Sequence, residues 1–388
     1  MKELLDSIYA VGADDTTLDL FESQYPVPQG VSYNSYVILD EKVAVLDTID
    51  TRATAEWNEN LKTVLAGRAP DYLIISHMEP DHSANIAALA RQYPAMKIVG
   101  NSKTFVQMGQ FFGADTFPSE RLVEVKEGDT LPLGHHTLQF IMAPMIHWPE
   151  VMMEYEQTDK VLFSADAFGK FGAVCRGGAW APEARRYYLN IVGKYGAQVQ
   201  ALLKKAAALE IRTICPLHGP VLAENLGQYL ALYDTWSSYR PEAPEEVLVA
   251  SASIHGNTKA AAAHLAEKLR VQGAAVTEID LTRTDVSYAV AEAFRCGKIV
   301  LACATYDGGL FPCMEAFLAH LKAKNFQRRT VALLENGTWA PMAAKLMRAQ
   351  LDTMKEITVC EAVVTVRSAL SPANEGQMDT LCTELLGK

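Results

Sequence analysis

The sequence predicts an α/β protein that is divided into two domains. The chain has 388 residues, which exceeds the size of most single domains. Hydrophobic residues make up 49% and charged residues 21% of the chain, so each domain can bury a core. Residues 239–246 are rich in proline and charge, as is typical of a linker, and the pattern of strands and helices changes there. We therefore expect one domain over residues 1–243 and a second over residues 244–388.

The first domain shows short apolar runs that are separated by segments of helical length. Residues 35–39 and 43–47 flank a tight polar turn, which predicts a strand hairpin. Further strands are predicted at residues 72–76, 97–99, 122–125, 138–142, 161–164 and 213–215. Helices are predicted at residues 83–92, 102–112 and 197–209. This mixture of hairpins and helices indicates sheet layers that are covered by helices.

The second domain alternates strands and helices at a regular spacing. Strands are predicted at residues 247–250, 275–279, 299–302, 330–334 and 358–366. Helices are predicted at residues 258–271, 286–296, 313–322 and 340–351, with one more after the last strand. Such an alternation predicts a parallel, doubly wound sheet.

Charge, hydropathy and cysteine spacing exclude several classes of protein. The formal net charge of −11 disfavours general binding of a phosphate backbone, so we expect no nucleic-acid partner. No stretch approaches the roughly 20 consecutive apolar residues of a membrane span, and we expect neither a signal peptide nor a membrane contact. The seven cysteines are scattered and include no C-x-x-C pair, which argues against a disulfide framework or a rubredoxin-type iron site. A reducing, cytoplasmic location is expected.

Residues 77–82, with the sequence HMEPDH, place four potential metal ligands directly after an apolar strand. In an extended turn, alternate positions point to the same side, so His77, Glu79 and Asp81 are expected to converge on one cavity. Without a metal, the same residues would form a polar turn before a helix.

Three later residues follow apolar strands in the same way. They are His147, Asp166 and His218, which come after the predicted strands at 138–142, 161–164 and 213–215. Each alone would suit an ordinary loop. Because strand ends meet at one rim of a sheet, together with the first cluster they predict a metal site.

A second group of motifs lies at the strand ends of the second domain. The first loop offers hydroxyls, a glycine and a helix N-terminus, and its candidate residues are Ser251, Ser253, Ile254, His255, Gly256, Asn257 and Thr258. Such a nest binds a single phosphate, as on FMN, and it matches neither the G-x-G-x-x-G nor the G-x-x-x-x-G-K-[ST] pattern.

Two further loops belong to the same predicted pocket. Their candidate residues are Ala304, Thr305, Tyr306, Asp307, Gly308, Gly309, Asn336, Gly337, Thr338 and Trp339. The glycines let the backbone approach a ring, and the two aromatic side chains can flank an isoalloxazine. Ligands bind at the carboxyl ends of strands in such sheets, so one FMN site is predicted from all three loops.

These motifs resemble known families. The ligand order, H-x-[HE]-x-D-H followed by His, Asp and His, resembles the metallo-β-lactamase fold, an αββα sandwich. The second domain resembles flavodoxin, whose expected strand order is 2-1-3-4-5. One followed by the other resembles the flavodiiron proteins, also called A-type flavoproteins, over nearly the whole chain. Supporting segments are NSY at 34–36, IHWP at 146–149, DAFG at 166–169 and ENGTW at 335–339.

The resemblance implies FMN and two non-haem iron ions as cofactors. One ion would be held by His77, Glu79 and His147 and the other by Asp81 and His218, with Asp166 as the bridge. His82 would be either a weak ligand or an outer hydrogen-bond donor, and Tyr195 would donate a hydrogen bond near the metals. Related hydrolases carry a histidine where this chain has Glu79, and the carboxylate suits iron better than zinc.

The resemblance further implies a cytoplasmic oxidoreductase. Electrons from a rubredoxin-like or flavin reductase donor would pass through FMN to the diiron site, which would reduce O2 to water, NO to N2O, or both. The family forms head-to-tail homodimers, or dimers of dimers. Two alternatives stay open: a zinc-dependent hydrolase with an appended flavodoxin, and an electron-transfer flavoprotein without gas reductase activity.

Overall fold

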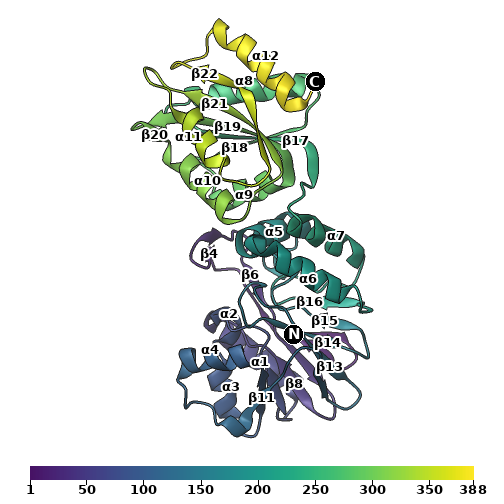
Figure 1. Cartoon of the computed structure of the whole chain (residues 1–388). Helices are drawn as coiled ribbons and strands as arrows, with labels where there is room; N and C mark the ends of the chain where they lie inside the picture. The colour runs from purple at the N-terminus through teal and green to yellow at the C-terminus, as the bar shows by residue number, and fades with distance from the viewer. The chain divides into compact units, whose positions relative to one another are not determined.

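The computed structural model describes residues 1–388 and divides them into two compact units (Figure 1). The first unit comprises Met1–Tyr188 and Ala197–Asp234, and the second comprises Leu189–Gly196 and Thr235–Lys388. None of the helices combines the length and the apolar composition needed to cross a bilayer.

Two sheets form the centre of the first unit. The larger has the order β1-β2-β7-β8-β9-β10-β11, with bounds Lys2–Leu5, Ile8–Ala10, Tyr36–Leu39, Val43–Leu46, Tyr72–Ile74, Lys97–Gly100 and Leu122–Glu124. The smaller has the order β12-β13-β14-β15-β16, with bounds Thr130–Pro132, Thr137–Met142, Met152–Glu156, Val161–Phe163 and Thr213–Cys215. Two short hairpins pair β3 with β6 and β4 with β5, with bounds Ala13–Asp15, Val31–Tyr33, Leu20–Phe21 and Tyr25–Pro26.

The facing sides of these two sheets make one hydrophobic core. Ile38 and Val99 of the larger sheet pack with Phe140, Met152 and Phe163 of the smaller sheet, all at most 2% exposed. The outer faces carry helices α1 to α4 on one side and α6 and α7 on the other (Figure 1). The helices of this unit are α1 Thr54–Leu65, α2 Pro80–Ser83, α3 Ile86–Gln92, α4 Ser102–Phe112, α5 Trp180–Tyr187, α6 Gly196–Ala206 and α7 Leu226–Ser237. The αββα sandwich is therefore confirmed.

The predicted helix at 83–92 is wrong at its start. Pro80 opens the short helix α2, which ends at Ser83, and α3 begins only at Ile86. Asn85 interrupts the two helices, since its side chain donates to the Ile49 carbonyl at 2.7 Å. The extended turn expected over residues 77–82 therefore ends at Glu79, and the residues after it are helical.

The second unit is a parallel sheet with helices on both faces. Its strands are β17 Ala243–Ala252, β18 Val276–Asp280, β19 Cys296–Tyr306, β20 Gly309–Leu310, β21 Arg329–Asn336 and β22 Ile357–Val366. The order β18-β17-β19-β21-β22 is the predicted 2-1-3-4-5, which confirms the flavodoxin-like sheet. Helices α8 Asn257–Val271 and α12 Pro372–Leu386 share one face, and α9 Val286–Arg295, α10 Pro312–Ala323 and α11 Ala343–Leu351 share the other (Figure 1).

Two predictions in this region need correction. Residues 243–246 were expected in a linker but begin β17, where the ladder is interrupted between Ala243 and Val247. Pro244 has no N–H to donate to a neighbouring strand, so the strand is irregular where it begins. Its proline and charged residues are also typical of a linker, which explains the wrong prediction. The predicted loop at 304–309 is a hairpin instead, in which Tyr306 pairs with Gly309.

Candidate metal centre and cofactor pocket

Seven ligand-type side chains of the first unit gather in two groups. One comprises His77, Glu79, His147 and Asp166, and the other comprises Asp81, His82 and His218. Within each group, the potential ligand atoms lie within 4.8 Å of one another. These residues follow β9, β13, β15 and β16, so both sheets supply ligands at the place where their strands end.

The short helix α2 decides how the first motif is shared between the groups. His77 and Glu79 precede the helix and join one group, whereas Asp81 and His82 are helical and join the other. An extended turn would have placed Asp81 on the same side as Glu79. The helical turn instead places it with His218, the residue with which the resemblance had paired it. His82, whose role the sequence left open, points its Nε2 into the second group, 3.0 Å from Nε2 of His218.

Asp166 lies between the two groups. Its Oδ2 is 3.0 Å from Nε2 of His147, and its Oδ1 is 3.4 Å from Nε2 of His82. One carboxylate therefore reaches both sets, which is the geometry that a bridging ligand requires.

The spacing of these atoms fits metal ions better than it fits hydrogen bonds. Both carboxylate oxygens of Asp81 and Oδ1 of Asp166 are buried and lack a hydrogen-bond partner, although Oδ2 of Asp81 is only 3.2 Å from Nε2 of His218. The atoms are close but do not point at one another. Ligands about 2.1 Å from a common ion are separated by about 3.0 to 3.4 Å at octahedral or tetrahedral angles. Separations of 3.0 to 3.4 Å within the two groups match that pattern, and only the distances from Asp166 to His77 and His218, at 3.6 and 3.7 Å, are longer. The residues present therefore fit a pair of metal ions.

Hydrogen bonds to residues outside the two ligand groups fix the orientation of two of the imidazoles. Nδ1 of His77 donates to Oε1 of Glu150 at 2.9 Å, and Nδ1 of His218 donates to the Ser32 carbonyl at 2.8 Å. Each donation leaves the Nε2 lone pair directed at the ligand group. Such partners are a common feature of metal sites, where they fix the tautomer of the ligand.

Without a cation, the centre holds protons on its histidines. Burial alone would lower the pKa of His147, but Asp166 and Glu79 raise it to about 9. Burial likewise opposes the shift of His218, whose pKa is raised to about 8 by Asp81 and Asp166. Metal ions would displace these protons, because a ligating imidazole must be neutral.

Tyr187 is a site residue that the sequence analysis missed. Its ring centroid lies 5.6 Å from that of His218, and its buried hydroxyl has no hydrogen-bond partner. Burial, with the nearby carboxylates of Asp166 and Asp81, raises its pKa well above the ordinary value, so the hydroxyl stays protonated. Tyr195, expected near the metals, lies in the second unit, and its role stays a prediction. Nothing in the local sequence marks Tyr187, because its position at the end of α5 places it near the metal ligands only in the folded chain.

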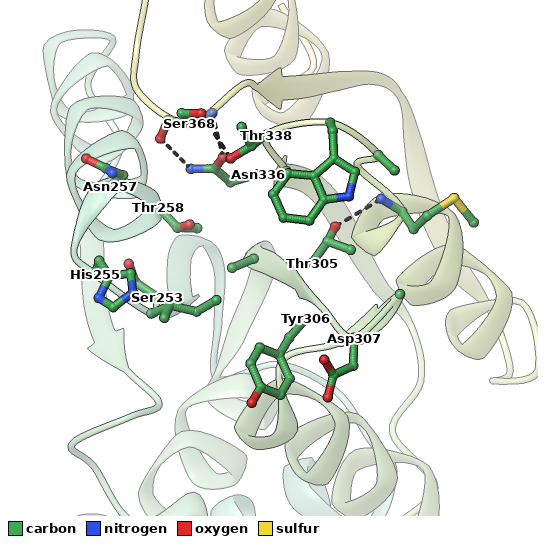
Figure 2. A pocket seen from close by; sticks show the side chains of 17 residues that line it. Ser253, His255, Asn257, Thr258, Thr305, Tyr306, Asp307, Asn336, Thr338 and Ser368 are labelled. Carbon is green, nitrogen blue, oxygen red and sulfur yellow. Dashed lines mark hydrogen bonds between the residues drawn. The ribbon is translucent and has the colours of Figure 1, made fainter.

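A pocket of about 640 Å³ lies at the strand ends of the second unit (Figure 2). Fourteen of its lining residues were predicted, namely Ser253, Ile254, His255, Asn257, Thr258, Ala304, Thr305, Tyr306, Asp307, Gly308, Asn336, Gly337, Thr338 and Trp339. Ser251, Gly256 and Gly309 were predicted but do not line it, while Ala340, Met342 and Ser368 line it and were missed. Pockets of this volume are typical of small-molecule cofactors.

The residues of this pocket fit a phosphate-bearing cofactor. No side chain caps the N-terminus of α8, so its first N–H groups remain directed at the pocket rim for an anion. The hydroxyl of Ser253 accepts a hydrogen bond from the Gly256 N–H at 3.0 Å, which shapes the loop before that helix. Tyr306 and Trp339 are 45% and 87% exposed, so both aromatic side chains are free to contact a ring.

Ser368 belongs to a fourth loop, after β22. Asn336 donates to its carbonyl at 3.0 Å, and its hydroxyl donates to that of Thr338 at 3.0 Å (Figure 2). The rule that ligands bind at the carboxyl ends of strands would have found it, had it been applied to the fifth strand as well.

The chain is similar to several known proteins. Residues 31–219 match the family model described as ODP family beta lactamase. The anaerobic nitric oxide reductase flavorubredoxin of Vibrio vulnificus is 28% identical over 359 residues, which cover 89% of this chain and 72% of that protein. The solved structure of rubredoxin oxygen:oxidoreductase from Desulfovibrio gigas is 25% identical with a TM-score of 0.91, covering 100% of this chain and 98% of the other. The resemblance to the flavodiiron proteins is confirmed.

The similarity to a further solved structure concerns the fold alone. The flavodiiron protein of Giardia intestinalis is 24% identical, with a TM-score of 0.93 and coverage of 100% of this chain and 96% of the other. Both domains of the chain therefore have the flavodiiron arrangement in sequence order, a metallo-β-lactamase-like sandwich followed by a flavodoxin-like sheet.

Proposed function

We propose that this chain is a flavodiiron oxidoreductase that reduces O2, NO or both with electrons from an external donor. One observation carries the proposal: a single carboxylate, Asp166, lies between two groups of histidines and carboxylates in a chain that also has a flavin-sized pocket. The names of the Vibrio and Desulfovibrio relatives support it, since one is a nitric oxide reductase and the other a rubredoxin oxygen:oxidoreductase.

The seven side chains of the two groups would hold the metals. His77, Glu79 and His147 would bind one ion, and Asp81, His82 and His218 would bind the other, with Asp166 between them. Bound iron would supply one-electron redox chemistry at this centre. Glu150 and Ser32 keep two of the imidazoles oriented toward it.

Protein groups around the centre would control water and protons. Tyr187 places a protonated hydroxyl beside His218, where it can donate a hydrogen bond to a bound substrate oxygen. Phe21 packs edge-on against the same imidazole, with ring centroids 5.2 Å apart, and excludes solvent from that side. The centre thus combines a polar interior with aromatic walls.

The pocket of the second unit would bind FMN. The N-terminus of α8 and the hydroxyls of Ser253 and Thr258 would take the phosphate, and the loops at 304–308 and 336–339 would contact the ring. FMN would supply the exchange between electron pairs and single electrons. A rubredoxin-like protein, as the names of the relatives suggest, or a flavin reductase would be the donor.

Assembly, location and domain limits complete the proposal. A head-to-tail homodimer, or a dimer of such dimers, would bring the flavin of one subunit to the metals of another. The cysteines are all free, and burial raises the pKa of Cys215 and Cys303, which suits the reducing cytoplasm. We keep the limits of the two functional domains at 1–243 and 244–388.

Anaerobic turnover with reduced rubredoxin tests the proposal. Consumption of O2 and of NO is measured separately on protein whose metal and flavin contents are known. We expect flavin reduction by the donor, followed by consumption of at least one gas. Stoichiometric zinc without iron in protein grown with ample iron would favour the hydrolase alternative, because zinc does not change redox state. Flavin reduction without gas consumption by iron-loaded protein would favour the electron-transfer alternative.

A further inference from the structure

An internal apolar cavity lies in the first unit, between the smaller sheet and helix α6. Side chains of the smaller sheet form one wall, and side chains of α6 form the other, including Met153, Leu162, Val199 and Leu202. These four are at most 6% exposed. The cavity measures about 10 Å³, about the space that one water-sized molecule needs. Because its walls are apolar, a water molecule inside would find no partners, and such cavities stay dry.

One turn of the chain joins this cavity to the metal centre. Phe168 lines the cavity and lies two residues after Asp166. The turn is held from both ends: the Gly169 N–H donates to the Asp166 carbonyl at 3.1 Å, and the Phe168 N–H donates to the hydroxyl of Tyr233. A side chain at Gly169 would come within 3.3 Å of the His218 Cβ. The same turn therefore contacts a metal ligand on one side and the cavity on the other.

Tyr233 closes the cavity next to this turn. Its ring stacks on that of Phe168 with centroids 4.2 Å apart, and it is 1% exposed. The two stacked rings form part of the apolar wall, and Asp166 lies two residues before Phe168 in the chain. A small apolar molecule in the cavity would thus be separated from the metal centre by one layer of side chains.

A surface groove adjoins the cavity. The groove has a volume of about 530 Å³ and is lined by residues of α6, α7 and the segment that joins them. It shares Leu203, Ala206 and Leu209 with the cavity, and all three are partly exposed. These side chains form the boundary between groove and cavity, so solvent, groove, cavity and metal-bearing turn follow one another in space.

From this succession we infer that the cavity is a docking site for a small uncharged diatomic gas on its way to the metal centre. The inference rests on the proposed function for its physiological ligand, O2 or NO. Such molecules are apolar and lose no hydrogen bonds on leaving water, and a dry apolar cavity has no ordered water to displace. The ligand groups, by contrast, are charged and polar, so entry through the apolar side is the less costly route.

Xenon tests the binding site without reference to catalysis, since it is an uncharged, apolar atom that binds in apolar cavities. Crystals of the full chain are pressurised with xenon. We expect xenon in the cavity of the wild type, and its absence there would overturn the inference. The variant Ala206→Phe fills the boundary between groove and cavity, and it should abolish the xenon site. Ala207→Phe is the matched control, because Ala207 lines the groove but not the cavity.

Gas kinetics test the delivery. Ala206→Phe should raise the KM for O2 and for NO several-fold, while kcat at saturating gas, metal content and flavin reduction by the donor stay at the values of Ala207→Phe. The smaller change Ala206→Leu should give an intermediate KM, and it covers the case in which the phenylalanine prevents folding. An unchanged KM in both Ala206 variants would overturn the delivery route. If the wild type consumes neither gas, the proposed function fails, and the xenon result still decides whether the cavity is a gas-binding site.

Discussion

Glu150 provides a sharp test of the proposed metal centre. It is 1% exposed, and its Oε1 accepts hydrogen bonds at 2.9 Å from Nδ1 of His77 and from the Met78 N–H. Burial opposes ionisation, but the contact with His77 holds the pKa of Glu150 below its ordinary value, so the side chain is a carboxylate. Glu150→Gln keeps the shape and removes the charge behind His77. Loss of such an outer partner typically lowers metal affinity by about 10- to 100-fold, equivalent to about 1.4 to 2.7 kcal/mol.

Glu154 offers the matched control. It lies on β14, is fully buried, and accepts from the hydroxyl of Ser76 at 2.9 Å. Burial, together with the nearby carboxylate of Asp47, raises its pKa well above the ordinary value, which favours the neutral acid. Glu154→Gln therefore exchanges one neutral group for another of the same shape, and metal affinity should stay close to that of the wild type.

Anaerobic titration of metal-free protein with ferrous iron against a chelator gives the affinities of both sites. We expect Glu150→Gln to weaken the site that contains His77 and to leave the site of Asp81, His82 and His218 less affected. Circular dichroism controls for folding. Equal losses in the Glu150 and Glu154 variants would refute the reasoning, because depth of burial rather than charge on the imidazole would then govern the affinity. An unchanged affinity in Glu150→Gln would show that His77 does not bind metal through Nε2.

Four further predictions concern other parts of the two sites. Tyr187→Phe should lower gas turnover by about tenfold. It should not lower the free energy of unfolding, since the buried hydroxyl of Tyr187 has no hydrogen-bond partner to lose. Turnover kinetics and denaturant unfolding measure the two effects, and a large loss of stability would contradict the prediction. Iron affinity should rise with pH and level off above about pH 9. The reason is that protons on His147 and His218, whose pKa values are about 9 and about 8, compete with the metal. The number of protons released when iron is loaded measures the effect. The same raised pKa values stabilise the metal-free fold at low pH, and that contribution should vanish as the pH rises through 8 to 9. Asn257→Ala combined with Thr258→Ala should weaken FMN retention but leave the metal content unchanged, and parallel loss of both would indicate a shared folding unit.

Much of the fold was predictable because it depends on local pattern. The alternation of strands and helices after residue 246 determined the parallel sheet, and right-handed crossovers leave few possible strand orders. Buried strands that contain charged residue types could not be predicted from the local pattern. Strand β14, Met152–Glu156, is buried throughout although it carries two glutamates, so hydropathy gave no signal for it. Its glutamates are accommodated by contacts with distant residues, such as Ser76 with Glu154.

The sequence by itself determined which residue types stand at the strand ends. His77, Asp166 and His218 each follow an apolar run, and this local fact was enough to predict a metal centre. The sheet of the second domain likewise brings the three predicted loops to one pocket, because parallel strands end at the same edge.

The local pattern did not divide these residues between two ions; only the resemblance implied that division, and the tertiary structure decided how it is built and supported. Helix α2 divides the first motif between two ligand groups, and Asp166 joins them across the ends of two sheets. Glu150 lies 73 residues from His77 in sequence, and its charge depends on that contact. Two buried glutamates only four positions apart, Glu150 and Glu154, therefore have pKa values that shift in opposite directions. The physical reason is that ionisation in a dry interior depends on which partner lies within hydrogen-bond distance, and packing of distant segments, not local sequence, sets that distance.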